Sequence, residues 1–84
     1  MYQVLSEAPP AITPRQRQVV ALIAAGCSNE EVAERLRISP RTAKAHSDVL
    51  RQKLGVSRRR QIPLAYRSAT GDDPLQGELQ SAEE

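Results

Sequence analysis

The stretch that decides the fold is SNEEVAERLRISPRTAKAHSDVLRQKLG, residues 28–55. Two of its serines mark helix starts. Ser28 stands three residues before Glu31, the spacing of a capping box, in which each side chain accepts from the other residue's free backbone amide. Ser39 precedes Pro40, and proline is favoured at the first helical position because no amide donor is needed there. Two helices separated by a tight turn are therefore predicted: residues 29–36 and residues 40–54.

The helix predicted over residues 40–54 has two different faces. At 100° per residue, one sector gathers the residues expected in the core, namely Ala43, His46, Ser47, Leu50 and Leu54. The other side gathers basic, polar and small residues, namely Arg41, Lys44, Ala45, Asp48, Arg51 and Gln52. Such a face fits a DNA major groove about 12 Å wide, although, taken alone, an ordinary solvated face would be the favoured interpretation. The short helix and turn before it form a helix-turn-helix, which favours the groove.

The flanking sequence predicts two more helices. Thr13 provides a cap for the first, and Ser57 can cap the last. Pro63 lies past the first turn of that last helix, where it lacks an amide donor and clashes with a carbonyl, so we expect a kink or a later start. The expected bounds are about residues 14–25 and 58–68. The predicted fold is all-α, a four-helix helix-turn-helix domain over residues 12–68.

The charge of the chain is distributed unevenly. All twelve basic residues lie between Pro14 and Arg67, against four acidic ones, which gives this part a net charge of +8. Residues 69–84 carry five acidic side chains and no basic one, and residues 1–11 carry one acidic side chain. Residues 1–11 contain two prolines and little periodicity, and residues 69–84 have acidic and small side chains that cannot bury enough surface to offset ordering entropy. We therefore expect a flexible N-terminal segment and a disordered acidic tail. A basic compact segment indicates a polyanionic partner.

The composition excludes several classes of function. A single cysteine and a single histidine, Cys27 and His46, cannot form an internal disulfide or a four-ligand zinc site. Two tyrosines are too few for recognition of single-stranded nucleic acid by base stacking. No apolar run approaches the roughly 18 residues of a membrane span, and the start has no signal-peptide pattern. We expect a cytoplasmic protein that is not an enzyme and needs no cofactor or metal.

Several short motifs follow one another along the chain, namely Ile12-Thr13-Pro14-Arg15-Gln16-Arg17, Ala25-Gly26-Cys27-Ser28-Asn29-Glu30-Glu31-Val32-Ala33, Leu36, Ile38-Ser39, Thr42-Ala43-Lys44-Ala45-His46 and Lys53-Leu54-Gly55-Val56. In this order they resemble the LuxR/GerE-type DNA-binding domain, which is also the output half of NarL/FixJ-family response regulators. The resemblance implies a recognition helix in the major groove and transcriptional regulation. It also implies a homodimer formed through the last helix, for which the candidate interface residues are Ile62, Leu64, Ala65 and Tyr66.

The resemblance also implies roles for single residues. Lys44 matches the residue that contacts bases or nearby phosphates, and Ala45 lies where a methyl group can touch thymine at the groove floor. Thr42, at the helix start, matches a phosphate contact assisted by helix amides. The remaining residues expected at DNA are Ser28, Asn29, Arg41, Asp48, Arg51, Lys53 and Arg59.

Three residues depart from the family pattern. Asp48 stands where a basic or polar contact is frequent, Val49 stands where the family often has Asn, and Pro63 interrupts the dimer helix. Asp48 could accept from cytosine N4, pair with Lys44, or repel phosphate, and pairing or repulsion is favoured over base contact. The leading hypothesis is a sequence-specific regulator of transcription that binds double-stranded DNA. The alternative is a protein-interaction module of the same fold that binds RNA polymerase or another regulator.

Overall fold

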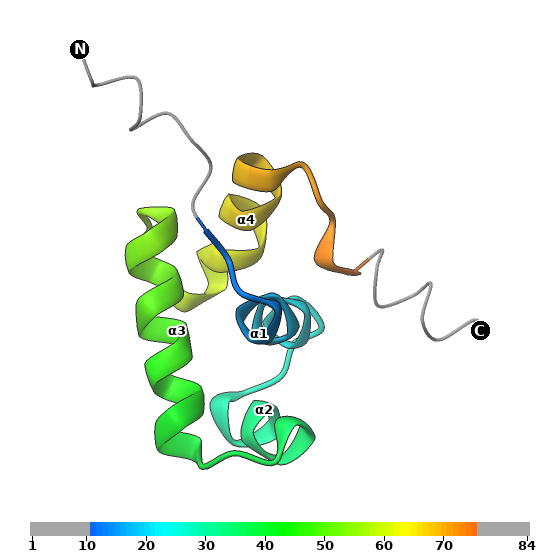
Figure 1. Ribbon diagram of the computed structural model, residues 1–84, viewed down its shortest axis with the longest axis vertical. Coiled ribbons are helices and arrows are strands. Elements are labelled where there is room, and N and C mark those ends of the chain that lie inside the picture. The colour runs from blue at the N-terminus through cyan, green and yellow to red at the C-terminus, as the bar shows by residue number, and fades with distance from the viewer. Residues whose placement is uncertain (1–10, 76–84) are drawn as a thin grey trace.

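The computed structural model describes residues 11–75, and this part of the chain contains helices and no strand (Figure 1). The elements are α1 (Pro14–Ala24), α2 (Asn29–Leu36), α3 (Pro40–Leu54), the 3-10 turn η2 (Arg59–Gln61) and α4 (Ile62–Thr70). In Figure 1, α3 runs along one side of the molecule, and α2, α1 and α4 lie along its other side. The all-α helix-turn-helix prediction is therefore confirmed. Disorder was predicted for both ends of the chain. Residues 1–10 and 76–84 of these ends lie outside the described residues.

Three of the four predicted N-terminal caps form, those of α1, α2 and α3. Thr13 Oγ1 accepts from the amide of Gln16 at 3.1 Å, and Gln16 Oε1 accepts from the amide of Thr13 at 3.0 Å. Ser28 and Glu31 form the same reciprocal pair at 3.2 and 2.8 Å. Ser39 caps α3 with its hydroxyl oxygen. The structure confirms the bounds predicted for α2 and α3.

Left-handed residues end the two helices of the helix-turn-helix. Gly55 terminates α3 with φ +70°, as expected for a residue without a Cβ. Arg37 terminates α2 with φ +59°, although a side chain makes this conformation less favourable. The helix α1 ends at Ala24, one residue before its predicted end.

The start of α4 differs from the prediction. Ser57 does not cap a helix; instead Gln61 Oε1 accepts from the amides of Ser57 and Arg58 at 3.2 and 2.9 Å, which supports the turn η2. The helix α4 then begins at Ile62, four residues later than predicted, so that Pro63 lies in its first turn, where no amide donor is required. The later start predicted from Pro63 is thus confirmed.

Each of the four α-helices contributes buried side chains to the hydrophobic core. Its largest fully buried side chains are Tyr66, Leu50, Ile62, Val19, Val20 and Val32. The helix α3 is anchored by Ala43, Ser47 and Leu50, which are buried. His46 and Leu54, which were also expected in the buried stripe, are only half-buried. The opposite side of α3 is left exposed to solvent.

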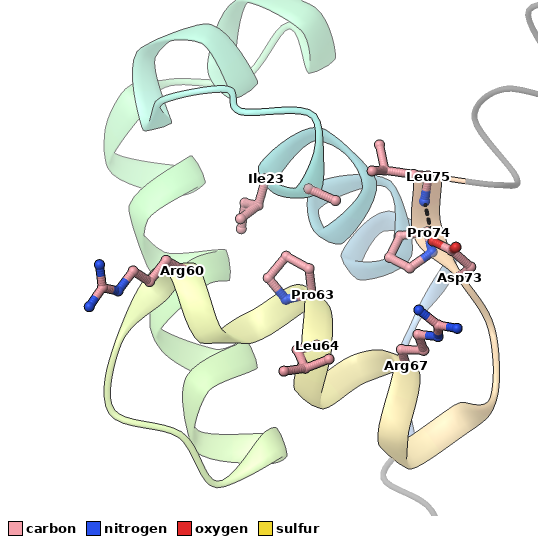
Figure 2. A pocket seen from close by; sticks show the side chains of 9 residues that line it. Ile23, Arg60, Pro63, Leu64, Arg67, Asp73, Pro74 and Leu75 are labelled. Atoms are coloured by element: carbon pink, nitrogen blue, oxygen red, sulfur yellow. Dashed lines mark hydrogen bonds between the residues drawn. The ribbon is translucent and has the colours of Figure 1, made fainter.

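The chain turns back after α4. The helix continues to Thr70, and Asp73 Oδ1 then accepts from the amide of Leu75 at 3.0 Å. Figure 2 shows Pro74 and Leu75 at one end of a groove between α1 and α4. Residues 69–75 therefore belong to the folded part of the chain, beyond the boundary predicted at residue 68.

Candidate nucleic-acid interface

The exposed side of α3 forms a polar surface, here called the recognition face. It consists of Arg41, Lys44, Ala45, Asp48, Arg51 and Gln52. At 100° per residue, Asp48 and Arg41 lie at the middle of this face, and Ala45 lies at one edge of it, nearly opposite the buried row of α3. The methyl group of Ala45 projects less than the longer polar side chains beside it. The helix can therefore approach another surface closely.

Two hydroxyl groups at helix starts keep a free donor. Thr42 Oγ1 accepts from the hydroxyl of Ser39 at 2.9 Å, so the Thr42 hydroxyl hydrogen is available to another acceptor. Ser28 Oγ accepts from the amide of Glu31 and likewise retains its hydrogen. Both residues are exposed, at the starts of α3 and α2. Phosphate oxygens are acceptors of the kind that such donors bind at helix N-termini.

Asp48 is paired on both sides along α3. Its Oδ2 accepts from Lys44 Nζ at 3.2 Å, and its Oδ1 accepts from Arg51. Hydrogen bonds from Arg51 and then Lys44 lower the pKa of the Asp48 carboxyl below its ordinary value of 3.8. The carboxylate is therefore charged at neutral pH, and the pairing is lost only as the pH falls through this lowered pKa. The structure thus contains the pairing that was favoured for Asp48.

Arg59 and Asn29 are bonded within the domain. Arg59 Nε donates to Asn29 Oδ1 at 3.0 Å, and its NH2 group donates to the carbonyl of Cys27 at 2.9 Å. Ser47 Oγ donates to the same Asn29 oxygen at 3.3 Å. Burial lowers the pKa of the Arg59 guanidinium because desolvation disfavours its charged form. Arg59 therefore joins η2 to the start of α2, and this structural role was not foreseen.

Lys53 and Arg51 also donate inside the fold. Lys53 Nζ donates to the carbonyl of Ala11 at 2.7 Å and to Gln16 Oε1 at 3.0 Å, which connects the end of α3 with the start of α1. Arg51 NH1 donates to the carbonyl of Ser57 at 3.2 Å. Among the described residues, the other two basic residues expected at DNA differ: Arg41 and Lys44 are exposed and donate to no carbonyl or side-chain amide oxygen. Lys44 donates to the Asp48 carboxylate instead.

Comparison with known proteins identifies the family. Residues 10–65 match the family described as GerE: bacterial regulatory proteins, luxR family. The chain belongs to this luxR family. It is 42% identical over 57 residues to the transcriptional regulatory protein MctR of Rhizobium johnstonii, covering 68% of this chain and 27% of MctR. It is 40% identical over 60 residues to the transcriptional regulatory protein UhpA of Salmonella typhimurium, covering 71% of this chain and 30% of UhpA.

The matches cover only part of each relative. A putative HTH-type transcriptional regulator, Mb0914c of Mycobacterium bovis, is 42% identical over 52 residues, covering 62% of this chain and 6% of that protein. The luxR-family chain thus spans less than a third of the length of the curated relatives it matches. No solved structure matches it significantly.

Of the four residues that were predicted at a dimer interface of this luxR-family domain, two are buried in the core. Ile62 and Tyr66 were expected at the interface, but their side chains are 0% and 1% exposed and belong to the core. Leu64 is 70% exposed, and Ala65 is half-buried beside it. Leu64 lies at the groove in Figure 2. Only Leu64 and Ala65 of the four can therefore contact a second copy.

Two exposed polar residues were missing from the expected contacts of the luxR-family domain. Gln52 lies on the recognition face four residues after Asp48, and its amide can donate to and accept from base edges. Arg37 is exposed in the turn just before α3. The helical period had already placed Gln52 on this face without including it among the expected contacts, whereas the exposure of Arg37 follows from the left-handed turn.

Residues 11–75 contain no group of three or more His, Cys, Asp or Glu residues that could hold a metal ion. None of their helices combines the length and the apolar character required to cross a bilayer.

Proposed function

We propose that this luxR-family domain binds double-stranded DNA sequence-specifically and regulates transcription, with α3 in the major groove. The observation that supports this best is the recognition face: polar and basic side chains beside the small Ala45, on a helix held from behind by Ala43, Ser47 and Leu50. A helix presented in this way, preceded by a short helix and a tight turn, has the geometry of a recognition helix.

The exposed groups have complementary tasks at DNA. Arg41 and Lys44 would neutralise phosphates or donate to bases, with release of counterions. The hydroxyls of Thr42 and Ser28 would donate to backbone phosphates, which position the protein without specifying sequence. Arg51, Lys53, Arg59 and Asn29 are bonded internally, so we assign them mainly to holding α3 and the neighbouring turns in place.

Binding to two half-sites would require two copies of the domain. One recognition helix contacts only a few base pairs, and dimeric helix-turn-helix proteins place two helices about one DNA turn apart. The exposed Leu64, with Ala65, is the apolar surface available on α4. We therefore propose a homodimer through these two residues rather than through Ile62 and Tyr66.

A salt titration tests the proposal. Duplex binding, measured by fluorescence anisotropy with random and selected duplexes at about 50 and 200 mM salt, should weaken with a log-log slope near −0.9 per phosphate contact. The alternative is that the domain binds RNA polymerase or another regulator, which the exposed Leu64 favours. No duplex affinity at about 50 mM salt would contradict the DNA proposal and leave this alternative.

Lys44→Ala is expected to weaken binding to a selected duplex by about 1–3 kcal/mol, because a base contact of Lys44 would be lost. Arg67→Ala is the matched control, since Arg67 is an exposed cation on α4 at the groove with α1, away from α3. Competition anisotropy on the two variants gives the difference. Equal losses of affinity for the two variants would mean that Lys44 makes no base contact.

A further inference from the structure

The Lys44–Asp48 pair places a donor and an acceptor side by side on the recognition face. The two residues are one turn apart on α3, and Lys44 Nζ lies 3.2 Å from Asp48 Oδ2. Their side chains are 67% and 43% exposed, so both head groups are accessible from outside. An accessible ammonium beside an accessible carboxylate can bind an acceptor and a donor that lie at a similar spacing.

We propose that Lys44 and Asp48 together recognise a single G·C base pair, Lys44 donating to guanine and Asp48 accepting from the cytosine N4 amino group. This inference rests on the proposed DNA-binding function and specifies which base pair the recognition face selects. It assigns to Asp48 a role in specificity through the pairing itself.

The edge of a G·C pair has a matching arrangement. In the major groove, guanine presents two acceptors, N7 and O6, and cytosine presents the N4 donor. Guanine O6 and cytosine N4 are hydrogen-bonded to each other, at the ordinary distance of about 2.9 Å. This spacing is close to the 3.2 Å between Lys44 Nζ and Asp48 Oδ2. The four groups can therefore form a closed set in which every donor faces an acceptor.

An A·T pair fits the two side chains less well. Its major-groove edge presents adenine N7 and thymine O4, both acceptors, on either side of the adenine N6 donor, followed by the thymine methyl group. A carboxylate placed at N6 would lie next to an acceptor on each side. The ammonium could bind only one of these two acceptors, N7 or O4, and would leave the other facing the carboxylate. In a G·C pair, by contrast, the acceptors N7 and O6 lie on the guanine side for Lys44, and the N4 donor lies on the cytosine side for Asp48.

Arg51 makes a carboxylate tolerable near DNA. Arg51 donates to Asp48 Oδ1, and Lys44 donates to Asp48 Oδ2. Because a carboxylate oxygen can accept more than one hydrogen bond, Oδ2 can also accept from a base. The three side chains together have a net charge of +1, which offsets the repulsion between Asp48 and the phosphates. The position of Arg51 is itself fixed by its bond to the Ser57 carbonyl at 3.2 Å.

The test is a selection of high-affinity duplexes from a random-sequence library with the wild-type chain and Asp48→Asn. Wild type should enrich G·C at one position. The variant should lose this preference by roughly 5- to 150-fold and shift toward A·T there, because an Asn side chain can bond to adenine N6 and N7. Preferences at the other positions should not change.

Glu34→Gln is the charge-matched control. Glu34 is an exposed acid on α2, outside the recognition face, so its neutralisation should raise affinity for all duplexes and leave base preference unchanged. The inference is overturned if Asp48→Asn retains the G·C preference or behaves as Glu34→Gln does. Circular dichroism of each variant checks that the fold is intact. If wild type binds no duplex at all, the proposed function itself fails.

Discussion

Replacement of Tyr66 by Ala is expected to lower the free energy of unfolding by about 3–5 kcal/mol. Tyr66 is the largest of the fully buried side chains and is 1% exposed. Its ring lies on α4, which packs against both α1 and α3, so the substitution leaves a cavity where three helices meet. A domain of this size has a total stability of only about 4–12 kcal/mol. We expect much of the Tyr66→Ala population to be unfolded at 37 °C.

The measurement is urea unfolding followed by circular dichroism, with Leu64→Ala as the control on the same helix. Leu64 is 70% exposed, so its truncation should change the free energy of unfolding by no more than about 0.5 kcal/mol. A similar loss for the two variants would mean that α4 does not pack through Tyr66. The comparison also separates the core residues of α4 from the surface proposed for the dimer.

Arg59→Ala is expected to lower the free energy of unfolding by about 1–3 kcal/mol, because two acceptors lose a charged donor. These acceptors are the Asn29 side chain and the Cys27 carbonyl, both about thirty positions away in the sequence. Arg59→Lys should recover only part of the loss, since a lysine cannot donate to two acceptors with the same planar geometry. Urea unfolding of the two variants measures both effects.

The neighbour Arg58 provides the control for Arg59. Arg58 is exposed, and Arg58→Ala should leave the free energy of unfolding within about 0.5 kcal/mol of wild type. Salt titration distinguishes the two roles that can be assigned to Arg59. A direct phosphate contact would make the log-log slope shallower by about 0.9, whereas a structural residue leaves the slope unchanged. An unchanged stability with a shallower slope would reverse our assignment.

The helix-turn-helix itself could be predicted from the sequence because its determinants are local. Ser28 with Glu31, and Ser39 with Pro40, act within one turn of the helix they start, and Gly55 acts at the end of α3. Pro63 predicted a later start of α4, but the cap predicted at Ser57 does not form, because the amides of Ser57 and Arg58 bond to Gln61 instead.

The division of the basic residues could not be predicted, because it depends on contacts between distant positions. Lys53 and Gln16 are 37 residues apart, and Arg59 and Asn29 are 30 apart. Composition counts all such cations equally as part of a basic surface. In the folded domain, Lys53 and Arg59 donate to acceptors within the fold, and Arg41 and Lys44 are exposed on α3. For the same reason, the helical period could place Tyr66 and Leu64 on one helix but could not say that α1 and α3 cover the former.

The bond between Lys53 and the Ala11 carbonyl has a mechanical consequence. It connects the point where the chain enters the domain to the C-terminal end of α3. A tensile force or torque applied to the polypeptide before Ala11 would therefore load the end of α3 through Lys53 as well as the first turn of α1.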